Sequence, residues 1–79
     1  MRILNDESDK KSDNISIFLT KAEALQLRAY LNQLLDNPKI HHIHLSSEDY
    51  QKEITVCIYD ENNLEGFHPR AIKLIKEDK

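Results

Sequence analysis

Residues 53–60 read Glu-Ile-Thr-Val-Cys-Ile-Tyr-Asp, and this stretch decides the fold. Ile54, Val56 and Ile58 alternate with Thr, Cys and Tyr, which is the period of two that a half-buried β-strand shows. The stretch contains neither glycine nor proline, as expected of a strand with neighbours on both sides. It therefore predicts a central strand with an apolar inner face and a mixed outer face.

The same period of two occurs in two other stretches. Residues 14–20 place two isoleucines and a leucine on one side and Phe18 on the other. Residues 40–46 alternate in the same way, with an isoleucine and a leucine inward and two histidines outward. Residues 47–52 are polar and predict a hairpin loop that joins the second strand to residues 53–60.

Helical signals lie between the first two strands and at the end of the chain. Thr20-Lys21-Ala22-Glu23 fits a capping box, in which the Thr hydroxyl and the Glu carboxylate accept hydrogen bonds from each other's backbone N–H. A leucine-rich stripe follows, and Pro38 ends it, so a helix is predicted over residues 21–36. A second, short helix is predicted to begin at Pro69.

The resulting order is β-α-β-β-α, which predicts an α+β fold. A helical crossover returns the second strand parallel to the first, and a short loop makes the third strand antiparallel to the second. We expect a two-layer sandwich in which both helices cover one face of a three-stranded, mostly antiparallel sheet. With residues 53–60 in the centre, this is a split βαβ unit similar to a fragment of a ferredoxin-like domain. Direct parallel pairing of the first two strands is the alternative.

Length and composition bound the domain organisation. A chain of 79 residues with 39% apolar side chains can form only one small core. Residues 5–14 contain no apolar side chain and cannot offset the entropy lost on ordering. We therefore expect residues 1–13 to form a flexible N-terminal leader and residues 14–79 to form a single domain.

Charge and cysteine content narrow the classes of partner. Eleven basic against 14 acidic residues give a net charge of −3, so the chain has no general attraction to nucleic acid or anionic membranes. No apolar run approaches the length of a membrane span. The single Cys57 cannot form an intramolecular disulfide, which favours the cytoplasm as the compartment.

The outer face of the predicted sheet is the candidate functional surface. It mixes apolar, aromatic and imidazole groups with few charges, whereas a solvated sheet face alternates to lysine, glutamate and threonine. Such a face predicts a homodimer or another protein partner, unless the leader or the second helix covers it. The predicted interface residues are Phe18, Ile40, His42, His44, Cys57 and Tyr59, with Leu25 on the far side of the first helix as a weaker addition.

The two outward histidines also suggest a metal site as an alternative. His42 and His44 are two residues apart on one strand, a spacing that can bring two imidazoles to one zinc or copper ion. Cys57 is the third candidate ligand, opposite His42 in one hairpin register and opposite His44 in a register shifted by two. The chain lacks Cys-x-x-Cys and His-Glu-x-x-His spacings, so ordinary polar strand residues or packing at an interface is the preferred interpretation.

Two other classes of function have weaker support. Phe18 and Tyr59 stand where an RNA-recognition sheet stacks bases, but residues 48–65 hold six acidic side chains against one lysine, which opposes single-stranded nucleic acid. For an enzyme, no oxyanion hole or phosphate-binding loop is evident, and Gly66 is the only glycine. The sequence therefore predicts a binding module without catalytic residues or cofactors.

Overall fold

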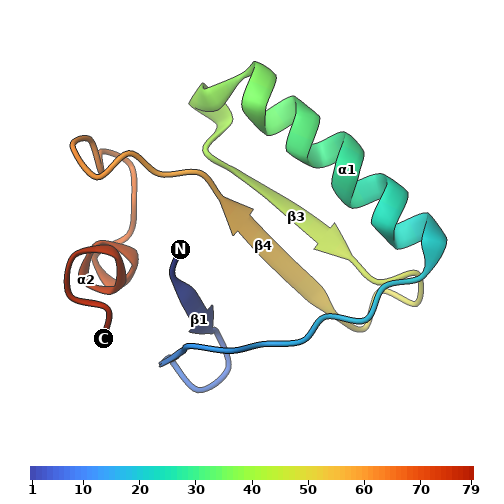
Figure 1. Ribbon diagram of the computed structural model, residues 1–79, viewed down its shortest axis with the longest axis horizontal. Helices are drawn as coiled ribbons and strands as arrows, with labels where there is room; N and C mark the ends of the chain where they lie inside the picture. Colours follow the sequence, from blue (N-terminus) through green and yellow to red (C-terminus); the bar gives the residue numbers. More distant parts are fainter. The chain divides into compact units, whose positions relative to one another are not determined.

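The computed structural model describes all 79 residues and shows a small α+β protein with two helices and two separate two-stranded antiparallel sheets (Figure 1). The chain divides into two compact units. One unit is Phe18–Tyr59, and the other combines Met1–Ile17 with Asp60–Lys79. Each unit contains one hairpin and one α-helix. Neither helix has the apolar length that crossing a bilayer takes.

Helix α1 spans Lys21–Asp36, the range predicted from the sequence. Thr20 Oγ1 accepts a hydrogen bond from Glu23 N at 3.2 Å, and Glu23 Oε1 accepts one from Thr20 N at 2.9 Å, which confirms the capping box. A short 3₁₀ turn, η1 (Pro38–Ile40), follows the helix, because proline cannot continue the α-helical hydrogen bonding.

Strands β3 (His42–Ser46) and β4 (Glu53–Cys57) form an antiparallel hairpin. Ile43 lies opposite Val56, which confirms the first of the two registers considered from the sequence. Both strands are shorter than predicted. Residues 38–40 belong to the 3₁₀ turn, and β4 ends three residues before the predicted end at residue 60.

The core of this unit lies between α1 and β3. Leu34 is fully buried, and Ile43 and Leu45 of β3 are only 8% and 3% exposed. Ile54 and Val56 on the inner face of β4 are half-buried, because α1 packs mainly against β3. The inner face of the hairpin is therefore well covered over β3 and incompletely covered over β4.

Residues 14–20 were predicted to be the first strand, and in the structure they form none. Their large side chains are exposed, with Ile15 at 54%, Ile17 at 48% and Phe18 at 92%. The strand prediction was wrong here because alternation alone does not supply the neighbouring strand whose backbone groups a strand needs. The three-stranded sheet and the ferredoxin-like arrangement are accordingly not confirmed.

The other unit contains β1 (Ile3–Asn5), β2 (Lys10–Ser12) and α2 (Pro69–Glu77). The antiparallel hairpin β1–β2 lies within the stretch predicted as a flexible leader. Asn5 Oδ1 accepts from the backbone N–H groups of the two turn residues 7 and 8, which stabilises the turn, and Ile3 and Leu4 of β1 are half-buried. The division into a leader of residues 1–13 and a domain of residues 14–79 stays a prediction.

Helix α2 begins at Pro69, as predicted, and buries Leu74 and Ile75. Arg2 Nε donates to Leu74 O at 3.2 Å and to Ile75 O at 3.3 Å. These carbonyls belong to the last turn of the helix, and Leu74 O also accepts from the backbone N–H of the C-cap residue Asp78 at 2.9 Å. A cation at this end also interacts favourably with the helix dipole. Arg2 therefore caps the C-terminus of α2.

Candidate interaction face

The outer side of the β3–β4 hairpin carries His42, His44, Thr55 and Cys57, and we refer to these four residues as the outer face; the Ser46–Glu53 pair lies on the same side at the loop end of the hairpin. All four are exposed, whereas the alternate residues of β3 are buried. The alternation predicted for both strands is therefore confirmed. His42 lies opposite Cys57, and His44 lies opposite Thr55.

The ladder places these cross-strand pairs at close range. Ser47 N donates to Lys52 O at 2.8 Å, and Ile58 N donates to His41 O at 2.9 Å, so the odd-numbered residues of β3 make the ladder hydrogen bonds. The pairs between outer-face residues are then non-hydrogen-bonded pairs, in which side chains approach more closely. The hairpin thus holds the four outer-face groups as one contiguous patch.

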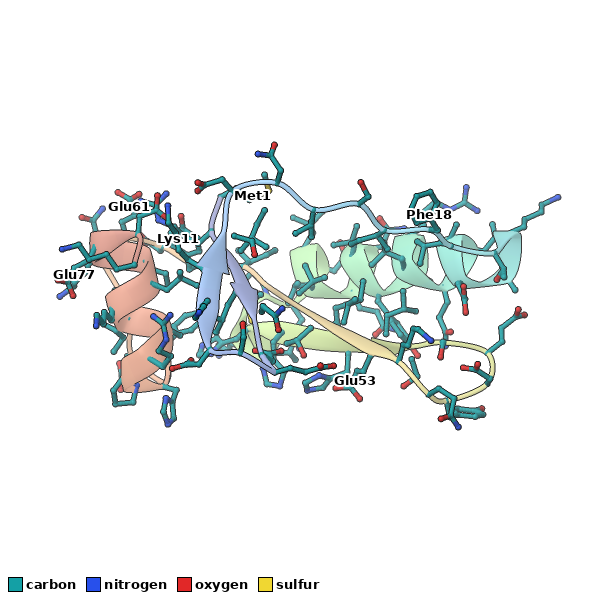
Figure 2. All side chains as sticks on the ribbon, turned by 90° about the horizontal axis from the view of Figure 1, so that it is seen from below. Met1, Lys11, Phe18, Glu53, Glu61 and Glu77 are labelled. Carbon is teal, nitrogen blue, oxygen red and sulfur yellow. The ribbon has the colours of Figure 1, made fainter.

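The two imidazoles form the centre of this patch. Their ring centroids are 5.0 Å apart at an interplanar angle of 72°, an edge-to-face arrangement. His44 Nδ1 lies 2.9 Å from Thr55 Oγ1 and 3.1 Å from Glu53 Oε1, near the start of β4, where Figure 2 labels Glu53. Thr55 and Glu53 both lie beside Nδ1, which leaves Nε2 as the ring nitrogen of His44 that a partner could contact.

The patch has almost no charged groups. Apart from the histidines, Glu53 is the only ionisable carboxylate or basic side chain on either strand, and it lies at the end of the hairpin. An exposed hairpin open to water on one side normally carries lysine or glutamate at alternate positions. Glu53 lies on the same side of the hairpin and its carboxylate is 3.1 Å from His44 Nδ1, so a partner that covers the outer face must leave this one carboxylate solvated or paired.

The other predicted interface residues lie elsewhere in the structure. Phe18 is on the segment that precedes α1 (Figure 2), and Ile40 is in η1 with 38% exposure. Tyr59 lies beyond the end of β4 and is half-buried, and Leu25 is 45% exposed on α1. The structure therefore gathers the two histidines and Cys57 on one face, and places neither aromatic residue on a strand. The base-stacking alternative needed both aromatic residues on the sheet.

The predicted metal ligands are only partly assembled. Register places His42 opposite Cys57, and the two histidine rings are neighbours. However, no group of three or more His, Cys, Asp and Glu side chains is arranged to hold a metal ion. The imidazole pair would need two further ligands to complete a tetrahedral site.

The Glu23 carboxylate makes two backbone hydrogen bonds, and the sequence predicted only one of them. A hollow of about 540 Å³ lies beside α1 and the hairpin loop, and Glu23 is buried on its wall. Hydrogen bonds from the backbone N–H groups of Thr20 and Glu48 lower the pKa of the Glu23 carboxyl. The capping motif predicted the first bond, but nothing in the sequence pairs Glu23 with a residue 25 positions later. The carboxylate is satisfied by the chain itself and serves the fold.

Comparison with known proteins found no match to this chain among family models, curated proteins or solved structures.

Proposed function

We propose that the protein is a small non-catalytic binding module that associates with a second copy of itself through the outer face. The composition of that face is the observation that supports the proposal most. Two imidazoles, a hydroxyl and a thiol lie exposed together, and the one carboxylate on the strands is at the margin. Burying neutral polar groups costs little when a partner supplies hydrogen bonds, whereas burying a lone charge costs much more.

A second copy is a suitable partner for chemical reasons. A neutral imidazole has one N–H donor and one acceptor nitrogen, and a threonine hydroxyl also donates and accepts. A patch of such groups is complementary to itself. Two copies related by a two-fold axis would present the His42–His44 pair to the same pair of the partner. Cytoplasmic location is part of the proposal, supported by the single cysteine.

Residues 14–20, the strand that was expected from the sequence and is absent from both sheets, are part of the proposal. In the associated state, residues 14–20 supply a strand beside the β3–β4 hairpin. The exposure of Ile15, Ile17 and Phe18 supports this step, because burying such side chains is favourable by about 25 cal/mol per Å². Phe18 would then stand next to the outer face as an aromatic contact.

Two matched variants test the surface. Thr55→Lys places an ammonium group in the centre of the outer face, and Gln51→Lys places the same group in the exposed loop of the same hairpin. We expect Thr55→Lys to raise the dimer dissociation constant at least about tenfold, equal to about 1.4 kcal/mol, and Gln51→Lys to leave it unchanged. Circular dichroism checks that both variants keep the helix content of the wild type. Equal effects of the two variants would place the contact elsewhere.

Transition-metal binding is the second candidate, and the 5.0 Å separation of the His42 and His44 rings favours it. Native mass spectrometry with and without zinc tests it directly. Zinc retained by the wild type and lost in His44→Gln would support a site at the pair. A wild-type protein that retains no zinc at micromolar concentration would exclude it.

A further inference from the structure

Strand β4 has an open edge. It pairs with β3 on one side and with no strand on the other, so the backbone N–H and C=O of Thr55 point away from β3 without a ladder partner. Its inner side chains Ile54 and Val56 are also only half-buried. An open edge beside incompletely covered apolar residues is a surface to which another strand can add.

Residues 14–20 have the apolar alternation of a strand but no neighbouring strand. They lie outside both sheets, and Thr20 at their end has an extended backbone (φ −69°, ψ 165°). Ile15, Ile17 and Leu19 occupy every second position and are 54%, 48% and 38% exposed. The segment therefore has the apolar period of a strand, and it needs a neighbour.

The direction of pairing can be argued from charge. Setting Ile17 opposite Val56 aligns three apolar pairs on the inner face in either direction, because 15, 17 and 19 then face the even residues 54–58. In the parallel direction Asp13 meets Lys52 and Lys21 meets Asp60, which are two attractive pairs. In the antiparallel direction Asp13 meets Asp60 and Lys21 meets Lys52, which are two repulsive pairs. Charge complementarity at both ends favours the parallel direction.

The parallel direction also identifies the donor of the strand. Thr20 leads directly into α1, and a helical crossover returns β3 parallel to the strand before the helix. Since β4 is antiparallel to β3, a chain's own residues 14–20 could reach its own β4 only in the antiparallel direction. A parallel strand at this edge must come from another molecule.

We propose that residues 14–20 of one copy add in parallel to the open edge of β4 in a second copy, with Ile17 opposite Val56. The exchange is reciprocal, so one two-fold axis fills both open edges. This inference rests on the proposed self-association and specifies how the second copy is held. It also places the partner's Phe18 beside Cys57, at the border of the outer face.

Thiol cross-linking distinguishes the two directions. In the parallel register residue 18 lies opposite Cys57, whereas in the antiparallel, own-chain register residue 16 lies opposite it. Phe18→Cys and Ser16→Cys therefore form a matched pair, each treated with a short bis-maleimide. We expect Phe18→Cys to give a covalent dimer whose cross-linked peptide joins residues 18 and 57 of different chains. An equal mixture of unlabelled and nitrogen-15-labelled protein shows whether the link joins two chains.

Two controls and three possible results distinguish strand exchange from self-association by another contact. The wild type measures any link between two Cys57 thiols, and Phe18→Cys with Cys57→Ser measures links between two residues 18. Ser16→Cys linked to Cys57 within one chain would overturn the exchange and support the split βαβ arrangement instead. If no link exceeds the controls while light scattering still shows dimers, the exchange is wrong and self-association stands. A protein that is monomeric throughout overturns both.

A charge swap checks the register independently. Asp13→Lys and Lys52→Glu should each weaken association by roughly two- to fivefold, as an exposed ion pair is lost and a repulsive pair replaces it. In a mixed dimer of the two variants both 13–52 contacts are attractive, one with reversed charges and one as in the wild type, so the mixture should associate more tightly than either variant alone. Equal affinity of the mixture and the single variants would contradict the register.

Discussion

The carboxylate of Glu23 joins two distant parts of one unit, because its Oε2 accepts a hydrogen bond at 2.8 Å from the backbone N–H of Glu48. Its other oxygen accepts from the backbone of Thr20 at the start of α1. One buried side chain thus caps the helix and fixes the hairpin loop beside it. Neither backbone donor would otherwise have a protein partner at this position.

Replacing Glu23 by glutamine should destabilise the Phe18–Tyr59 unit. The glutamine amide has one accepting oxygen, so only one of the two backbone donors keeps its bond, and the charge-assisted character of both is lost. We expect a lower urea midpoint for Glu23→Gln than for Glu61→Gln, which removes a carboxylate from an exposed position. Equal midpoints for the two variants would contradict a structural role for Glu23.

The stability supplied by Glu23 should depend on pH. Hydrogen bonds from the backbone of Thr20 and of Glu48 hold its pKa below the ordinary glutamate value, which is about 4.3. A group whose pKa is lowered on folding adds stability above its unfolded pKa and loses it as the pH falls through the folded pKa. The difference in melting temperature between wild type and Glu23→Gln should therefore be full near neutral pH and shrink under acid conditions. A difference that stays constant down to about pH 3 would refute this assignment.

Arg2 should stabilise the last turn of α2. Arg2→Ala removes the side-chain donor of Ile75 O and one of the two donors of Leu74 O, which keeps its bond from Asp78 N, and it removes a cation from the helix C-terminus. We expect this change to cost about 1 kcal/mol. Amide hydrogen exchange should speed up in residues 74–78 first. Arg28→Ala, an exposed change on α1, is the control and should leave these rates unchanged. Unchanged exchange in Arg2→Ala would show that the cap contributes nothing.

Two adjacent leucines should differ sharply in their contribution to stability. Leu34 is fully buried and Leu35 is 65% exposed, although both belong to the apolar stripe seen in the sequence. Leu34→Ala should cost about 2–5 kcal/mol, enough to unfold much of so small a unit, whereas Leu35→Ala should cost far less. Chemical denaturation of both variants measures the difference. Comparable losses would mean that α1 turns a different side to β3.

Local signals explain why part of this fold was predictable. The Thr20–Glu23 capping box and Pro38 define α1 from within one turn of each end, and the structure confirms that range. Only the parity of the hairpin register was predictable, since a slip by one residue would turn every apolar side chain outward, whereas a shift by two keeps the same faces. The structure selects the register with Ile43 opposite Val56.

Other features depend on contacts between segments, which the alternation of apolar residues along one segment does not reveal. The alternation of residues 14–20 says which side each residue would face in a strand, but not whether a neighbouring strand is present. The turn of the β1–β2 hairpin depends on the Asn5 side chain, which the polar composition of residues 5–14 did not predict, whereas Ile3 and Leu4 of β1 are half-buried. On the candidate face, alternation predicted the grouping of His42, His44 and Cys57, whereas Phe18 depended on the strand that the structure lacks.

The most direct test of the central claim is the mass of the wild-type protein in solution, measured by light scattering from low to high micromolar concentration. Self-association through the outer face predicts a mass that rises with concentration to twice that of the chain, and a return to the monomer mass in Thr55→Lys. A monomer mass at every concentration for the wild type would contradict the claim.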